Sequence, residues 1–72
     1  MNENAFKDAV GKYLDSMPYR SKVAFPDMIL TVCEWLGYPF KRSPYNNWAQ
    51  HVVYSRVDLA VYRGRGIVKV RP

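Results

Sequence analysis

A chain of 72 residues is long enough for one small domain, and its single cysteine, Cys33, excludes an internal disulfide. Hydrophobic residues make up 49% of the chain and aromatic residues 15%, so we expect a folded core. No apolar run approaches the roughly 18 residues of a membrane span, and the first residues, MNENAFKD, lack the pattern of a signal peptide. We therefore expect one soluble, cytoplasmic domain over residues 1–72, with no membrane partner.

The positive charge is concentrated in the second half of the sequence. Residues 1–40 contain four basic and five acidic side chains, for a net charge of −1. Residues 41–72 contain seven basic side chains and one acid, Asp58, for a net charge of +6. This asymmetry is typical of a surface that binds a polyanion, although small proteins are also often basic for solubility alone.

The first helix is predicted to run from the N-terminus to about Ser16. Asn2 or Asn4 can cap its start, because an asparagine oxygen accepts hydrogen bonds from the free amides of the first turn. Pro18 ends it, because proline disfavours the helical conformation of the residue before it. The apolar residues recur at helical spacing and form one stripe that we interpret as core. They are Phe6, Val10, Tyr13, Leu14 and Met17.

A brief strand is predicted over residues 19–25, YRSKVAF, between the first two helices. Successive side chains of a strand point to opposite sides. Val23 and Phe25 would therefore lie on one side of the extended chain, and Lys22 and Ala24 on the other.

The second helix is predicted to start at Pro26, where the missing amide costs no hydrogen bond. Asp27 beside it complements the positive end of the helix dipole. The helix runs to Leu36, and Gly37 supplies a left-handed stop. Its predicted inner face consists of Ile29, Val32, Cys33 and Leu36.

The third helix is predicted over residues 43–55, with Ser43 as its N-cap and Pro44 at the first helical position. Residues from Val57 onwards are β-branched or aromatic and end the helix near Ser55 or Arg56. One face is apolar and consists of Tyr45, Trp48, Ala49 and Val52. The other face is polar and consists of Asn46, Asn47, Gln50, His51 and Tyr54.

Residues 57–71 predict a hairpin that turns at Gly64-Arg65, because glycine suits the first position of a two-residue type II′ turn. The turn fixes the register. It pairs Arg63 with Gly66, Tyr62 with Ile67, Val61 with Val68, Ala60 with Lys69 and Leu59 with Val70. Opposed residues share a face, so Leu59, Val61, Val68 and Val70 would all face the core. A three-residue loop would mix the two faces, and we therefore favour the two-residue turn.

The order helix, strand, helix, helix, hairpin resembles that of the winged-helix domain, a helix-turn-helix whose hairpin is the wing. The likeness covers nearly the whole chain. It implies an α+β fold with three helices and a C-terminal β-hairpin, in the order α-β-α-α-β-β. It also implies that helix 43–55 enters the major groove of DNA and that hairpin 57–71 contacts the backbone or the minor groove.

A few residues are also similar to the winged-helix segment of Mrr-type restriction proteins. They are Trp48-Ala49, Leu59 and the Arg65-Gly66 turn with its aliphatic strand. The sequence contains no nuclease domain, so we infer no nuclease activity from this likeness.

The polar face of the third helix is suited to reading bases. Asparagine and glutamine can each form two hydrogen bonds with an adenine edge, and Asn46, Asn47 and Gln50 lie near the helix start, where recognition helices contact bases. His51 and Tyr54 continue this face and could reach a base or a phosphate. An ordinary solvent face usually contains Lys or Glu, and this one does not. The alternative is a solvated face without function.

Seven cations are candidate contacts with the DNA backbone: Lys41, Arg42, Arg56, Arg63, Arg65, Lys69 and Arg71. Arg63 or Arg65 could also enter the minor groove. If about five engaged, the logarithm of affinity would fall with that of salt at a slope of about −4 to −5. RNA is less favoured, because the usual aromatic motif of a base-stacking sheet is missing: Tyr62 is the single aromatic residue on the outer face of the predicted hairpin.

Catalysis is not expected, and neither is binding of a metal or a cofactor. His51 is the single histidine, and neither it nor Cys33 has a ligating or catalytic partner at suitable spacing. The sequence therefore predicts a protein that binds double-stranded DNA, as a small transcriptional regulator or a phage or plasmid accessory factor.

The alternative is a small adaptor or inhibitor that presents the basic hairpin and aromatic residues to an acidic protein surface. A homodimer or a protein partner is also compatible with the sequence. Trp35, Tyr38 or Tyr13 would then serve as exposed anchors.

Overall fold

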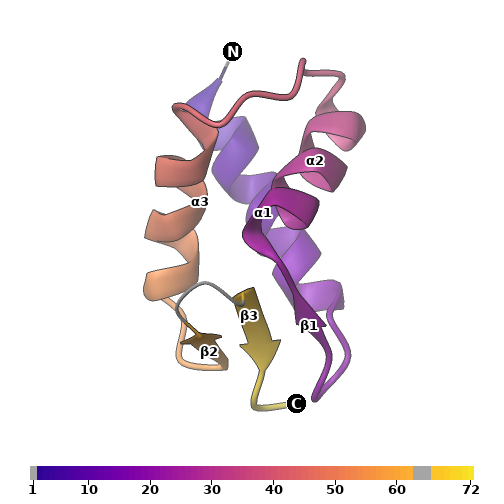
Figure 1. The fold of residues 1–72 in the computed structure, drawn as a ribbon, viewed down its shortest axis with the longest axis vertical. Helices are drawn as coiled ribbons and strands as arrows, with labels where there is room; N and C mark the ends of the chain where they lie inside the picture. The colour runs from indigo at the N-terminus through magenta and orange to yellow at the C-terminus, as the bar shows by residue number, and fades with distance from the viewer. Residues whose placement is uncertain (1, 63–65) are drawn as a thin grey trace.

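The computed structural model describes residues 2–62 and 66–72, which form three helices and three short strands (Figure 1). The helices are α1 (Glu3–Ser16), α2 (Phe25–Leu36) and α3 (Tyr45–Tyr54). The strands are β1 (Lys22–Val23), β2 (Leu59–Tyr62) and β3 (Gly66–Lys69). The predicted α+β class and the order α-β-α-α-β-β are confirmed.

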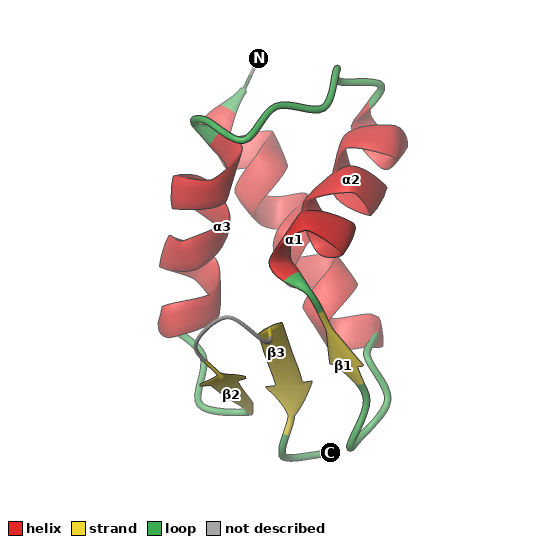
Figure 2. Cartoon of the chain, in the orientation of Figure 1, coloured by secondary structure: helices red, strands yellow, loops and turns green. Residues whose placement is uncertain are grey.

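The helices pack beside one another, and the sheet closes one end of the molecule. Figure 2 shows the strands gathered at the end where α1 and α3 finish. β3 lies in the centre of the sheet and pairs antiparallel with β1 on one side and β2 on the other. The hairpin is therefore joined to β1, which precedes it by more than 30 residues in the printed sequence.

Helix α1 begins and ends as predicted. The Asn2 side-chain oxygen accepts a hydrogen bond from the Ala5 amide at 3.0 Å, and the helix finishes at Ser16. The predicted apolar stripe faces the core. Its buried members are Phe6, Val10, Leu14 and Met17, and Tyr13 packs against them half-buried.

Helix α2 starts at Phe25, one residue before the predicted start, so Phe25 belongs to the helix and not to the strand. Gly37 ends the helix in the left-handed conformation, with φ +70°, as predicted. The inner face is wider than predicted, because Met28 is also fully buried. The other buried residues of α2 are Ile29, Val32 and Cys33.

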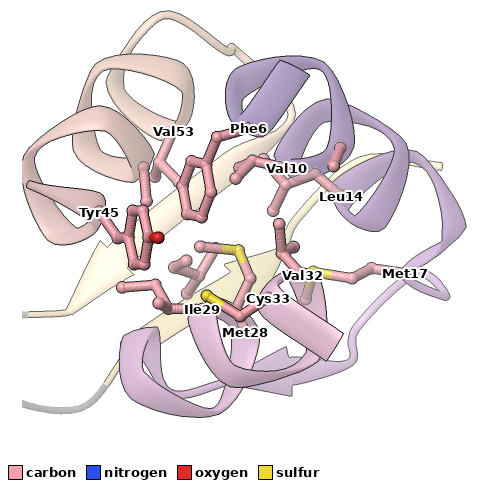
Figure 3. Close-up of a cluster of buried hydrophobic side chains, with 13 residues drawn as sticks. Phe6, Val10, Leu14, Met17, Met28, Ile29, Val32, Cys33, Tyr45 and Val53 are labelled. Carbon is pink, nitrogen blue, oxygen red and sulfur yellow. The ribbon is translucent and has the colours of Figure 1, made fainter. Parts of the chain in front are cut away.

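Aromatic side chains fix α3 against α1 in the core (Figure 3). The Tyr45 ring is fully buried and stacks on the Phe6 ring, with ring centroids 4.8 Å apart and planes 10° apart. Trp48 packs against both rings at a centroid distance of 5.7 Å. Each such pair contributes about 0.5–1.5 kcal/mol beyond the area that it buries. These contacts set which face of α3 points inward.

The predicted start of α3 is wrong by one residue. The helix begins at Tyr45, Pro44 occupies the cap position, and no side chain caps the first turn. Pro44 has φ −90° and ψ 5°, which is outside helical geometry, so it is not the first helical residue and Ser43 is not the N-cap. The peptide bond between Ser43 and Pro44 is cis. The helix ends at Tyr54, one residue before the predicted end.

The predicted hairpin register is wrong by one residue. The structure pairs Leu59 with Lys69, Ala60 with Val68, Val61 with Ile67 and Tyr62 with Gly66. The predicted turn residues, Gly64 and Arg65, lie outside the described part of the chain. A slip of one residue moves every side chain of a strand to the opposite face. Ile67 and Lys69 therefore face the core, whereas Val68 lies on the outer face and Val70 is 40% exposed.

Gly66 allows β1 to approach β3 closely. A Cβ at this position would clash with the Val23 carbonyl oxygen and lie 3.0 Å from the Ala24 Cα. The φ of Gly66 is +109°, which side-chain-bearing residues rarely adopt. The observed register places Gly66, the residue of β3 that has no side chain, at the point where β1 comes closest.

Alanine substitutions at three glycines should separate backbone strain from this close approach. Gly66→Ala should lower the free energy of unfolding by about 2–4 kcal/mol, because it adds both a strained φ and a clash. Gly37→Ala, with positive φ but open space around its Cβ, should lower it by about 1 kcal/mol. Gly11→Ala, inside α1 with no atom near its Cβ, should raise it by about 0.5–1 kcal/mol.

Chemical denaturation of the three variants measures this order. Equal losses at Gly37 and Gly66 would show that the contact with β1 does not constrain position 66.

Candidate nucleic-acid interface

The polar face of α3 points to solvent. Asn46, Asn47, His51 and Tyr54 are exposed, and Gln50 is half-buried. The opposite face packs into the core through Tyr45, Ala49 and Val53, with Trp48 and Val52 half-buried beside them. Figure 1 shows α3 at one side of the molecule, with no other element on its outer side. The structure therefore brings the five predicted base-reading residues together on one accessible helix face.

Helix α3 has the dimensions of a helix that fits the major groove. With its side chains an α-helix is about 10–12 Å across, and the major groove is about 12 Å wide. The segment 45–54 contains no Asp, Glu, Lys or Arg. Electrostatic attraction must therefore come from residues beside the helix, and the face itself offers hydrogen bonds without repelling phosphates.

Two cations stand at the N-terminal end of α3. Lys41 and Arg42 are exposed, and within residues 2–62 and 66–72 neither side chain forms a hydrogen bond or an ion pair. The Arg42 carbonyl oxygen accepts a hydrogen bond from the Asn46 amide at 2.7 Å, which ties the connector to the first turn. The bond holds the Arg42 backbone beside the first turn of α3, which carries the amide side chains that could read bases.

The surface at this end of α3 is concave. Two adjoining hollows share Arg42 and Asn46 in their walls. The remaining lining residues are Pro26, Ile29 and Phe40 in the first hollow, and Ser43, Pro44 and Asn47 in the second. A guanidinium group and a carboxamide thus line one recessed surface between α2 and α3.

Arg56 is used inside the protein. Its Nε and Nη2 donate to the two carboxylate oxygens of Asp58 at 2.9 and 2.8 Å. Nη2 also lies 2.8 Å from a carboxylate oxygen of Asp15, and Nη1 donates to the Gly11 carbonyl at 3.3 Å. The hydrogen bond with Asp58 raises the pKa of Arg56 and lowers the pKa of Asp58 well below its usual range. Arg56 therefore joins α1 to the start of the hairpin, and we remove it from the predicted phosphate contacts.

Lys69 is also used internally. It is only 5% exposed, and its Nζ donates to the Leu14 carbonyl oxygen at 2.6 Å. The same Nζ lies 3.4 Å from a carboxylate oxygen of Asp58. A lysine at this depth cannot reach a phosphate, and it too leaves the predicted set. The pattern Arg56-x-Asp58 is a local signal for the ion pair, whereas the partner of Lys69 in α1 is 55 residues away.

The other predicted cations occupy two places or lie outside the described residues. Arg71 is exposed after β3, next to the C-terminus, which lies at the sheet end of the molecule, whereas Lys41 and Arg42 belong to the connector between α2 and α3, which runs across the opposite end (Figure 1). Arg63 and Arg65 fall outside the described part of the chain, so the structure does not place them relative to α3.

The three aromatic side chains predicted as partner anchors differ in exposure. Trp35 is 54% exposed, whereas Tyr13 and Tyr38 are half-buried. Tyr13 packs against Trp35 with ring centroids 5.7 Å apart, and Tyr38 packs against Tyr45 at 6.3 Å. Only Trp35 of these three presents a mainly open ring.

Among the described residues, no cluster of His, Cys, Asp and Glu side chains has the size and arrangement to hold a metal ion. None of the three helices, as described, has the length and hydrophobicity needed to cross a bilayer.

Comparison of the chain with protein-family models, with curated proteins and with solved structures found no match. Function must therefore be inferred from the side chains that this fold exposes and from those that it uses internally.

Asp58→Asn should reveal the charge cluster through its pH dependence. The variant leaves Arg56 and Lys69 without their shared carboxylate, and we expect a loss of about 2 kcal/mol in unfolding free energy near pH 7. The pKa of Asp58 is lower in the folded than in the unfolded state, so its contribution is present above about pH 4 and is lost as the pH falls further. The difference between wild type and variant should therefore shrink in acid.

Urea denaturation at a series of pH values from neutral to acidic measures this difference. Asp8→Asn, at an exposed position of α1, is the matched control and should change stability by less than about 0.5 kcal/mol. A loss for Asp58→Asn that is constant across the acidic range would contradict the assignment.

Proposed function

We propose that the protein binds double-stranded DNA, with the exposed face of α3 in the major groove. The observation that carries this proposal is the face of Asn46, Asn47, Gln50, His51 and Tyr54, which is accessible and free of acidic side chains. Lys41 and Arg42 stand at its N-terminal end without ion pairs in the described part of the chain. Asn46 and Asn47 are placed where a recognition helix contacts base edges, and each can form two hydrogen bonds with adenine.

The position of the hairpin supports the same mode of binding. β2 begins after only four residues beyond the end of α3, so the hairpin and the C-terminal end of α3 lie close together (Figure 1). In this proposal the hairpin is a wing on the flanking backbone, as in the winged-helix domains that the chain resembles. Arg71, Arg63 and Arg65 are the cations assigned to it.

The two candidate roles, transcriptional regulator and accessory factor, differ in whether binding depends on the DNA sequence. A transcriptional regulator must prefer a particular site, whereas an accessory factor that coats or bends DNA can bind without base preference. The amide side chains of α3 favour the first role, because hydrogen bonds to base edges are what distinguishes sequences. Measurement of base preference therefore separates the two.

Binding to a random-sequence duplex should depend strongly on salt. The five predicted cations that remain after Arg56 and Lys69 are removed give a slope of about −4 to −5 if all contact phosphates. A slope of about −2 would mean that Lys41 and Arg42 act alone. Fluorescence anisotropy of a labelled duplex over a series of salt concentrations measures the slope. Absence of salt-sensitive binding at micromolar protein would overturn the proposal.

Substitutions should separate base reading from phosphate binding. Asn47→Ala should cost about 1–3 kcal/mol on a preferred site, a loss that disappears on random duplex. Lys41→Ala combined with Arg42→Ala should weaken binding to every duplex alike and make the salt slope shallower by about 2. Site selection from a random pool, followed by anisotropy on selected and random duplexes, provides both readouts.

Matched controls lie on α1. Asn4→Ala and Lys12→Ala change an exposed amide and an exposed cation on α1 and not on α3, and neither should alter binding. If Asn4→Ala and Asn47→Ala had equal effects, α3 would not be the reading helix.

A further inference from the structure

The outer face of the sheet is a second surface, separate from the exposed face of α3. The register places Lys22 of β1, Val68 of β3 and Ala60 of β2 in one row on this face. Tyr62 and Gly66 form the next pair on the same side. The alternate row, Val23, Ile67 and Val61, packs toward the helices. The predicted register put Ile67 and Lys69 on the outer face with Ala60 and Tyr62. In the observed register Ile67 and Lys69 face the helices, and Val68 takes their place on the outer face.

Tyr62 offers an open aromatic ring on this face. Its side chain is 52% exposed. The residue opposite, Gly66, has no side chain, and Ala60 two positions earlier on β2 has a small one. Val68 is half-buried between Lys22 and Ala60. The ring therefore lies beside a shallow apolar area formed by Gly66, Ala60 and Val68, which we call the apolar floor. A flat group could lie on it without meeting a bulky side chain.

Positive charge borders this floor. Lys22 is exposed, and within the described residues its ammonium group has no ion pair. Arg20 is exposed beside the sheet, where its amide donates to the Lys69 carbonyl at 2.8 Å, and Arg71 is exposed after β3. The three strands contain no acidic residue. Asp58, which precedes β2, has its carboxylate engaged by Arg56 and Lys69, so it does not offset these cations.

We propose that the outer face of the sheet binds single-stranded nucleic acid, with a base stacked on Tyr62 and phosphates near Lys22 and Arg20. A planar base matches an open ring over small residues, and a phosphate backbone matches the cations at the border. The outer strands β1 and β2 are about 10 Å apart at the usual strand spacing, so a short extended stretch of chain spans them. A duplex fits this face less well, because its base faces are hidden by stacking.

This surface shares no residue with the base-reading face of α3, although the hairpin that carries Tyr62 is also the wing of the proposed function. Tyr62 and Lys22 belong to the sheet, and the base-reading residues belong to α3, so each surface can be tested while the other is intact. DNA and RNA single strands share the stacking base and the phosphate backbone. The test therefore includes both.

The experiment measures the fluorescence anisotropy of labelled oligo-dT and oligo-U, each about 15 nucleotides long, as the protein with its full chain is added. Tyr62→Ala should weaken binding of both strands about 5- to 20-fold, because stacking on one base is lost. Tyr62→Phe keeps the ring and should stay within about twofold of wild type. Lys22→Ala should make the salt slope shallower by about 0.7, the value for one phosphate contact with a single strand.

Asn4→Ala and Lys12→Ala are the controls, because both residues are exposed on α1 and should leave single-strand binding unchanged. Equal affinity for oligo-dT and oligo-U is expected from stacking alone, and tighter binding of one identifies the natural strand. Absence of binding to either strand at low salt would overturn the proposal. So would a normal affinity of Tyr62→Ala, or a loss in Asn4→Ala as large as that in Tyr62→Ala.

Discussion

The carboxylate of Asp58 holds the two halves of this fold together. It accepts hydrogen bonds from Arg56 and lies against the ammonium group of Lys69, and both cations also bind carbonyl oxygens of α1. Removing charges from water is costly, and here the cost is offset because each charged group has several partners. The cluster ties the C-terminal part of α1 to the hairpin. It also requires Lys69 to face inward, and that requirement determines which side chains of β3 face solvent.

A second constraint, the aromatic cluster around Tyr45, determines the surface of α3. Because Tyr45 is stacked on Phe6 and covered by Trp48, the helix cannot rotate without losing these contacts. The residues between the buried positions are then forced outward, and they are the amides at positions 46 and 47. The same helix therefore supplies part of the core and the face proposed to read DNA. The proposed function of this face depends on the stack, although no ring of the stack needs to touch DNA.

The helices could be predicted from the sequence because their signals are local. Asn2 caps α1, Gly37 stops α2, and apolar residues recur at helical spacing between them. The hairpin register could not be predicted in this way, because it depends on a contact with β1 that tolerates only glycine at position 66. The prediction took the register from a two-residue turn at Gly64-Arg65, which placed four aliphatic residues in the core and Lys69 outside, where lysine is usually found. Lys69 is buried nevertheless, because the Leu14 carbonyl of α1 and the carboxylate of Asp58 are its partners inside the protein. No spacing pattern in the sequence predicts the hydrogen bond to Leu14.

The net charge of the second half also has a different meaning in the folded protein. Arg56 and Lys69 are neutralised within the fold, so they add nothing to a binding surface. Apart from Lys7 and Lys12 on α1, the cations that remain in the described residues form two groups, Lys41 and Arg42 in the connector before α3 and Lys22, Arg20 and Arg71 in or beside the strands of the sheet. These groups lie toward opposite ends of a molecule 31 Å long, whereas charges are screened over about 8 Å at physiological salt. Each group should therefore act on its own stretch of phosphates, and changes in the two groups should be additive in binding free energy.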